Sequence, residues 1–238
     1  MNAAAVELAL ATLALTMATA LRPWRALGVD GPPWPWVIAW AVLPLLWSLD
    51  RQLGVALLPP LSGAALLVLM TGWPLAVLAC VPMAIVATLC GPLDAAAALH
   101  RAVWLGIVPA TVALGLGTAL RQWLPRHVAV YVMSRGFFCA GLAAMLAGVL
   151  GGAGIACMPD ADAWVARALM ALAEASITGG LVAVMVVQRP ALLATYSDRL
   201  YLEHADAASA RAPRERPLQE LATQEPHHPT HRRRHARW

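Results

Sequence analysis

Lysine is missing from this sequence, and charged residues of every kind are scarce. All 17 basic side chains other than histidine are arginines, and charged residues make up 13% of the 238 positions. A soluble domain usually has about one-quarter charged residues. The chain is also 60% hydrophobic, with a mean hydropathy of +0.65. These values exclude a single soluble globule and indicate a protein embedded in a membrane.

The motifs of several enzyme classes are also missing. The sequence contains no GxSxG nucleophile turn, no HExxH zinc motif and no GxxxxGK[ST] phosphate loop. No apolar segment carries two carboxylates at helical spacing. We therefore expect that the chain is not an enzyme, with an intramembrane protease or transferase as the alternative.

Seven apolar segments are each near the length needed to cross roughly 30 Å of hydrocarbon. They cover residues 3–21, 34–49, 53–70, 73–90, 100–120, 128–157 and 164–188. Residues 71–74 alone join the third to the fourth, which predicts a tight helical hairpin. The sixth is too long for one straight crossing, and we expect a break at Gly151-Gly152-Ala153-Gly154. The predicted fold is all-α: a bundle of about seven transmembrane helices over residues 1–204, then a disordered cytoplasmic tail over residues 205–238.

Arginines and acidic residues separate between the two sets of connections. Arginines follow the first, fifth and seventh segments, at Arg22, Arg25, Arg121, Arg126, Arg189 and Arg199. The opposite connections hold Asp50, Asp94, Asp160 and Asp162. Because cytoplasmic loops carry the excess of basic residues, we expect the N-terminus outside and the tail in the cytoplasm. Residues 18–20 resemble a signal-peptidase site, but no basic residue precedes them, so we expect the first segment to be retained.

Small residues recur every four positions in the last two segments. The sixth has Ala140, Ala144, Gly148 and Gly152, and the seventh has Ala171, Ala175, Gly179 and Ala183. Each set forms one stripe along a helix, where backbones can approach closely. We therefore expect the sixth and seventh segments to pack together.

Two ionisable residues fall well inside predicted spans. Arg135 is roughly 12 Å and Glu174 roughly 15 Å from the nearer end of its helix, given a rise of about 1.5 Å per residue. Such charges are costly in a bilayer and usually face the bundle interior or water. Glu174 is therefore either part of a polar pathway or a structural partner of a donor such as Arg135. Glu7 and Arg167 lie nearer the ends and can extend to the interface.

The four cysteines form no CxxC pair, and free cysteines usually pack as small apolar residues. Two of them nevertheless fall at the same predicted ends of the spans as a histidine and a methionine. The predicted outer ends of the spans hold Cys90, His100, Cys157 and Met158. Sulfur and imidazole suit a transition metal, so these four residues are a candidate metal group, although their spacing matches no known ligand pattern.

Three stretches resemble a known family. They are "LPPLSGAALLVLMTGWPLAVLA" (58–79), "LPRHVAVYVMSRGFFCAGLAAM" (124–145) and "LAEASITGGLVAVMVVQRPALLATYSDRLYL" (172–202). Together they resemble the cobalt/nickel energy-coupling-factor permeases of the ABC transporter class (CbiM/NikM type), and "RPALLATYSDRLYL" resembles the proteobacterial branch. The resemblance covers roughly residues 35–204.

The resemblance implies a seven-span protein of the bacterial inner membrane with an external N-terminus. It implies uptake of Co²⁺ or Ni²⁺, in cobalt members for cobalamin biosynthesis. The implied partners are ATPase subunits and a transmembrane coupling subunit, with the lipid bilayer around the chain.

The sequence departs from the family at the implied metal site. The family uses a histidine at the second residue and another twelve residues before the glycine of the hairpin, positions that hold Asn2 and Pro60 here. Arg101 and Arg135 stand where this branch implies asparagine, whereas Glu174 matches the family. Two hypotheses stay open: a permease that uses other ligands, or a member without the metal site that serves as a partner-binding or assembly subunit.

The tail ends in "HHPTHRRRHARW" (227–238) and has almost nothing apolar to bury. We expect a solvated, disordered end that binds no nucleic acid. Attraction to anionic headgroups and weak metal buffering by the tail histidines are the alternatives.

Overall fold

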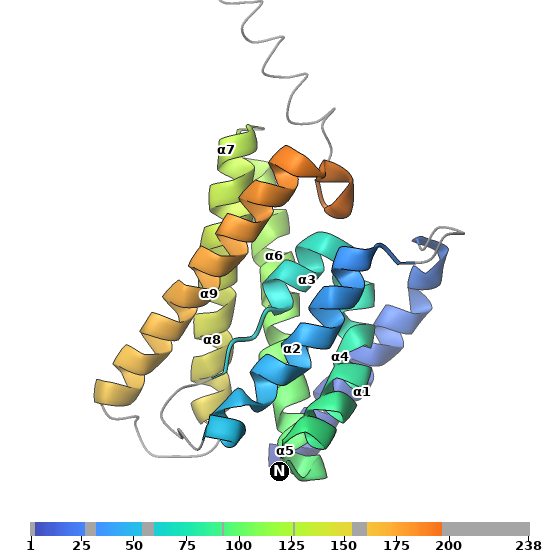
Figure 1. Cartoon of the computed structure of the whole chain (residues 1–238), viewed down its shortest axis with the longest axis vertical. Helices are drawn as coiled ribbons and strands as arrows, with labels where there is room; N and C mark the ends of the chain where they lie inside the picture. Colours follow the sequence, from blue (N-terminus) through green and yellow to red (C-terminus); the bar gives the residue numbers. More distant parts are fainter. Residues whose placement is uncertain are drawn as a thin grey trace, which may run out of the picture.

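The computed structural model describes residues 3–26, 32–53, 60–91, 93–125, 127–153 and 161–196, and every regular element in these ranges is a helix. Seven helical segments form a bundle (Figure 1). They are α1 (Ala3–Ala20), α2 (Trp34–Leu53), α3 (Ala64–Thr71), α4 (Trp73–Cys90), α5–η2–α6 (Ala95–Arg101, Ala102–Ile107, Val108–Trp123), α7–η3–α8 (Val128–Tyr131, Val132–Phe138, Cys139–Ala153) and α9 (Ala161–Gln188). The short 3₁₀ turns η1 (Pro23–Ala26) and η4 (Pro190–Leu192) follow α1 and α9.

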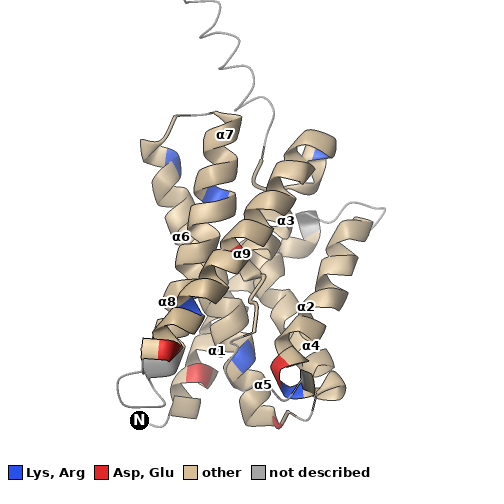
Figure 2. Cartoon of the chain, turned by 60° about the vertical axis from the view of Figure 1, so that its left-hand side comes forward, with Lys and Arg blue, Asp and Glu red and all other residues tan. Residues whose placement is uncertain are grey.

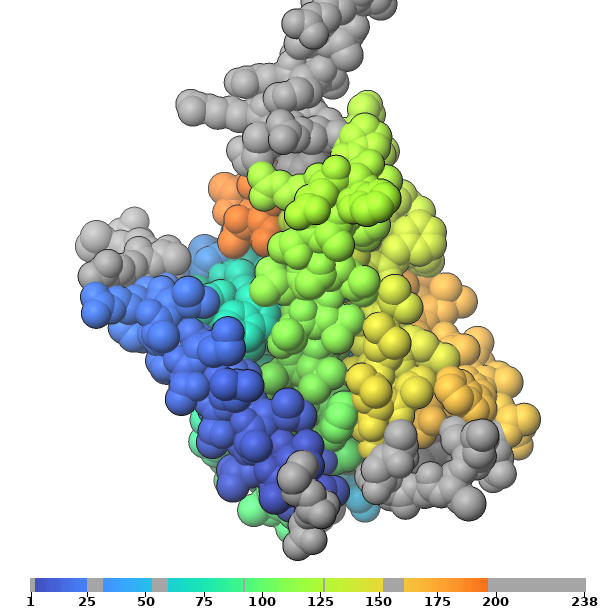
Figure 3. All heavy atoms as spheres, turned by 180° about the vertical axis from the view of Figure 1, so that it is seen from behind, coloured from blue at the N-terminus to red at the C-terminus, as the bar shows by residue number. Residues whose placement is uncertain are grey.

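Five of these segments are long and apolar enough to cross a membrane: α1, α4, α5–α6, α7–α8 and α9. The chain is thus an all-α, multi-pass membrane protein, as predicted. Seen from behind, α1, the α5–α6 helix and α8 lie side by side across one face (Figure 3). Residues 205–238, for which we predict a disordered tail, lie outside the described part of the chain.

The two ends of the bundle differ in charge (Figure 2). Acidic residues lie where α2 ends and where α5 and α9 begin, at one end of the bundle, together with two arginines: Asp50, Asp94 and Asp162, with Arg51 and Arg101. Arg22, Arg121 and Arg189 lie at the opposite end, where α1, α6 and α9 end. Asp50, Asp94 and Asp162 thus gather at one end as predicted, but Arg51 and Arg101 lie there too, so the arginines are only partly separated from the acids. The cytoplasmic placement of the opposite end stays a prediction.

The third segment differs from its prediction. We predicted a span over residues 53–70, but residues 60–63 are not helical and α3 has only eight residues. Gly63 has a left-handed backbone (φ 65°), which an L side chain rarely adopts and which breaks a helix. As a result α3 starts part-way along the neighbouring helices (Figure 1) and all eight of its residues are buried.

The predicted hairpin between α3 and α4 is confirmed. Gly72 alone separates the two helices, with φ of 80°, and its N–H donates to the carbonyl of Val68 at 2.9 Å. Gly151, Gly152 and Ala153 of the predicted break in the sixth segment are the last described helical residues of α8, and Gly154 lies outside the described residues, so the break stays a prediction.

Helices α8 and α9 pack along their length, as predicted, but one of the two predicted stripes is displaced. On α9, Ala171, Ala175 and Gly179 do face the partner helix. The residues they meet are Phe137 of η3 and Gly141 of α8, whereas Ala140 packs in a separate cluster with Ala65 and Ala113. The face of α8 that meets α9 therefore includes Gly141, which lies about 100° around the helix from Ala140.

Gly141 and Gly148 give a matched test of this packing. A Cβ on Gly141 would lie 3.0 Å from the Cβ of Ala175 and 3.2 Å from the carbonyl oxygen of Ala171, while one on Gly148 meets only the Cδ of Arg167 at 4.0 Å. Gly141→Leu should destabilise the fold by about 1–3 kcal/mol or more. Gly148→Leu should unfold close to wild type. Thermal unfolding in mild detergent measures both, and equal loss in the two variants would contradict this contact.

Candidate functional site

The centre of the bundle holds a carboxylate that binds the backbone just before the half-helix α3. Glu174 lies midway along α9 and is 3% exposed. Its Oε2 accepts the backbone N–H of Ser62 and its Oε1 accepts that of Gly63, both at 2.9 Å. The first amides of a helix have no partner within the helix, and the positive end of its dipole favours an acidic group. The N–H of Ala64, the first residue of α3, donates to the Ser62 hydroxyl oxygen at 3.1 Å, so Glu174 of α9 holds the two residues just before the helix, Ser62 and Gly63.

The other polar groups of Ser62 and Gly63 are bonded too. The carbonyl of Ser62 accepts from Trp47 Nε1 at 3.0 Å, and the carbonyl of Gly63 accepts from the N–H of Leu67 at 3.1 Å. The Ser62 hydroxyl donates to the carbonyl of Leu105 at 2.6 Å. Irregular backbone at membrane depth is tolerated only where protein or a water-filled cavity satisfies it. Here the protein does so.

A proline explains why the carbonyl of Leu105 is free to accept. In an α-helix this carbonyl would bond the amide of residue 109, but Pro109 has no amide hydrogen. The helix adopts the π-helical segment η2 just before this point, and the Ser62 hydroxyl takes the freed carbonyl. The proline of one long helix thus provides an anchor for the interrupted segment.

Arg135 has other partners than the one we predicted. Its Nη2 donates to the carbonyl of Gly117 at 2.7 Å, and its guanidinium carbon lies 5.8 Å from the ring centroid of Tyr131. The predicted pair between Arg135 and Glu174 is therefore wrong, because the backbone of residues 62–63 supplies the donors to that carboxylate.

A second polar group lies near the beginning of α1. Glu7 is only 8% exposed, and its Oε1 accepts from Trp104 Nε1 at 3.0 Å and lies 2.6 Å from His100 Nδ1. We predicted that Glu7 could extend to the interface, and this is wrong because α5 and η2 pack over it. The hydrogen bond through Nδ1 leaves Nε2 as the other nitrogen of the ring, and His100 is about one-third exposed.

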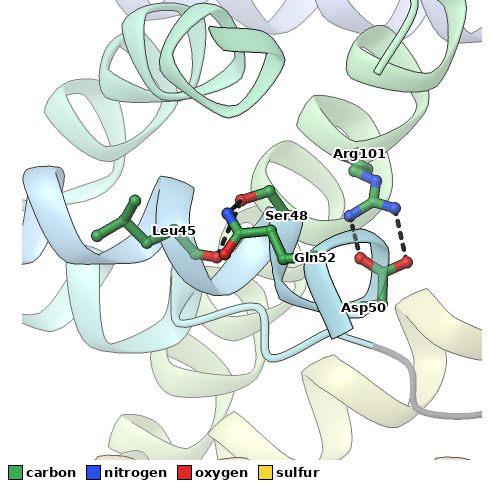
Figure 4. Close-up of polar contacts among 5 residues, drawn as sticks. All are labelled: Leu45, Ser48, Asp50, Gln52 and Arg101. Carbon is green, nitrogen blue, oxygen red and sulfur yellow. Dashed lines mark hydrogen bonds and ion pairs between the residues drawn. The ribbon is translucent and has the colours of Figure 1, made fainter. Parts of the chain in front are cut away.

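Arg101, the residue after His100 in α5, forms an ion pair with Asp50 of α2 (Figure 4). Arg101 Nη1 and Nη2 donate to the two carboxylate oxygens of Asp50 at 2.8 and 2.7 Å. Asp50 lies just beyond the apolar stretch 34–49. Its burial alone would raise its pKa, but the hydrogen bonds and charge of Arg101 outweigh this and hold the pKa below its usual value. The positive charge of Arg101, unexpected in a cation permease, is thereby neutralised.

The predicted metal group is only partly within the described residues. Cys90 is exposed at the end of α4, and His100 is bonded to Glu7. Cys157 and Met158 fall outside the described part, as does Asn2. In the described part, no group of three or more His, Cys, Asp or Glu residues could hold a metal ion. Pro60 lies at the beginning of the interrupted segment.

Glu174 lies between two cavities. The smaller, of about 50 Å³, is bounded by Pro60, Ser62 and Arg167 on the side of η2 and α8. The larger, of about 360 Å³, is an open crevice between α2, α3 and α9 whose walls are apolar apart from Glu174 and Thr178. We name it the lateral crevice.

The sequence indicated Glu174, His100 and Arg101 but not their respective partners Ser62, Glu7 and Asp50. The serine lies in a short Pro-Pro-Leu-Ser-Gly stretch (59–63), whose two prolines and glycine could have indicated an interruption. Glu7 and Asp50 gave no such signal, because their partners are 93 and 51 residues away.

Comparisons of the chain with protein families, with curated proteins and with solved structures find no match.

Proposed function

We propose that the chain is the membrane permease subunit of a transporter, and that its cargo is a divalent transition-metal cation, Co²⁺ or Ni²⁺. The observation that carries the proposal is the interrupted third segment, in which non-helical residues 60–63 lie inside the bundle against Glu174. Transporters commonly use interrupted helices of this kind near the bilayer midplane, where substrate sites lie. A protein whose only task is to anchor a partner has no need of such a costly arrangement.

The metal cargo rests on the family resemblance and on His100. Metal-binding histidines usually donate their second ring nitrogen to a carboxylate, which fixes the tautomer and the direction of the ring. Glu7 is placed to do this for His100, with Trp104 holding the same oxygen. In this proposal Glu174 fixes the half-helix, and His100 is a ligand at the end of the bundle where the N-terminus lies.

The proposal includes the partners and the location that the resemblance implies. ATPase subunits and a transmembrane coupling subunit would supply the energy, in a bacterial inner membrane. The N-terminus would be outside and the arginine-rich end of the bundle in the cytoplasm.

Metal accumulation in the cells that naturally carry this chain tests the proposal. Removing the chain should lower cellular cobalt or nickel, and restoring it should recover the level, with magnesium unchanged as the control. Equal accumulation with and without the chain would refute transport and leave the partner-binding or assembly hypothesis.

The ligand role of His100 gives a second expected result. In the purified full-length chain, Glu7→Gln should weaken Co²⁺ binding by about 10–100-fold, the usual loss when the partner of a metal-binding histidine is removed. His100→Ala should weaken it further. His127→Ala is the control, because His127 is exposed at the start of α7 and lies in no polar cluster described above. Calorimetry measures all three, and unchanged affinity in His100→Ala would contradict the role of this residue.

A further inference from the structure

The lateral crevice is a feature that the proposed function does not use. It has a volume of about 360 Å³, within the usual range of ligand pockets, about 300–1,000 Å³. One wall is α2, with Ile38 and Val42, and the opposite wall is α9, with Ile177 and Leu181. Its floor is the interrupted segment, with Leu61, Gly63 and Leu66.

The crevice opens toward the hydrocarbon of the bilayer. The side chains at its mouth are among the exposed apolar residues of the protein, with Ile38 at 56%, Val42 at 43% and Ile177 at 48%. Helix α9 has the length and composition of a membrane span. The mouth therefore lies at the depth where lipid chains surround the protein.

The floor presents no polar backbone to the crevice. The N–H groups of Ser62 and Gly63 point to Glu174, and their carbonyls accept from Trp47 and Leu67. Glu174 and Thr178 are the polar residues of its lining, and both carboxylate oxygens of Glu174 already accept backbone N–H groups. The crevice therefore offers little to water, which needs two or more polar partners. A single hydrocarbon chain is thin and flexible enough to enter.

We propose that the lateral crevice binds one acyl chain of a bilayer phospholipid, which covers the interrupted segment on the side where none of the described helices does. Irregular backbone is not found in open contact with the bilayer core. The acyl chain completes the packing of Leu61, Gly63 and Leu66 between α2 and α9. This proposal does not depend on the nature of the transported cargo.

A phospholipid with a photoreactive diazirine on its acyl chain tests the proposal in nanodiscs that contain the full-length protein. After illumination, peptide mass spectrometry should find adducts on α3, at Leu66 or Met70, which line the crevice and are buried from the rest of the bilayer. Val77 of α4, equally buried but outside the crevice, should carry none. An unlabelled α3 in the folded protein would overturn the proposal.

Two tryptophan variants separate the crevice from the general lipid surface. Val42→Trp fills the mouth and should abolish the α3 adducts. Leu45→Trp, on the same helix and similarly exposed at 47% but outside the crevice, should leave them unchanged. If Val42→Trp does not fold, Leu181→Trp fills the crevice from α9, with Val184→Trp as its control. Adducts on α3 that persist in a folded, filled variant would also overturn the proposal.

Discussion

Replacing Glu174 with alanine should lower the free energy of unfolding by about 2–6 kcal/mol, since each of two buried donors left without a partner costs about 1–3 kcal/mol. The two donors are the amides of Ser62 and Gly63, which have no other acceptor nearby. In water a lost cap is replaced by solvent, but at the centre of this bundle little water can replace it. The loss should appear as a lower midpoint of unfolding in detergent.

Two further variants make the Glu174 result specific. Glu174→Gln keeps one acceptor oxygen but places an amide group toward the second backbone N–H, so its loss should be intermediate. Ser176→Ala lies two residues away on the exposed side of α9, where its hydroxyl bonds only its own helix, and should behave as wild type. If Glu174→Ala is as stable as Ser176→Ala, the carboxylate does not hold the half-helix.

The second large effect is expected at the ion pair between Asp50 and Arg101. Arg101→Ala leaves the Asp50 carboxylate largely buried without its partner, and such a loss costs about 3–5 kcal/mol. Replacing both residues with leucine should cost far less, because it removes both charges together. Arg51→Ala is the control, since Arg51 is exposed in the last turn of the same helix. A double variant as unstable as Arg101→Ala would contradict this explanation.

The same pair gives the direction of a pH dependence. The pKa of Asp50 is lowered in the folded protein, so its carboxylate binds a proton less readily there than in the unfolded chain, where the value is about 3.9. The pair therefore contributes its full stability above about pH 4 and loses it as the pH falls through the lowered value. In the double leucine variant this part of the acid sensitivity should be absent.

The sequence predicted the helical segments well because each is a long apolar run bounded by prolines, glycines or charges. It also predicted the packing of the last two helices, although Gly141 makes the contact and Ala140 packs elsewhere. The failure in the third segment has a physical cause. Residues 53–70 are apolar enough for a span. Hydropathy measures only how apolar the side chains are, so it gives no sign of the left-handed backbone of Gly63.

The candidate site could be predicted only as single residues. The sequence alone indicates Glu174 as a site residue, because a carboxylate inside a membrane span is costly and therefore rare. Its partners are backbone amides, which every residue except proline carries, so no side-chain pattern points to residues 62 and 63. The pairs of Glu7 with His100 and of Asp50 with Arg101 join distant segments, and a single sequence gives no information on which distant residues meet.

Hydrogen exchange at the backbone amides of Ser62 and Gly63 tests most directly whether Glu174 holds the interrupted segment inside the membrane. In the wild-type protein both amides should exchange slowly, because each donates to a carboxylate oxygen that is closed to water. In Glu174→Ala both should exchange quickly, while Ser176→Ala keeps the wild-type rate. Rapid exchange of these two amides in the folded wild-type protein would contradict the account.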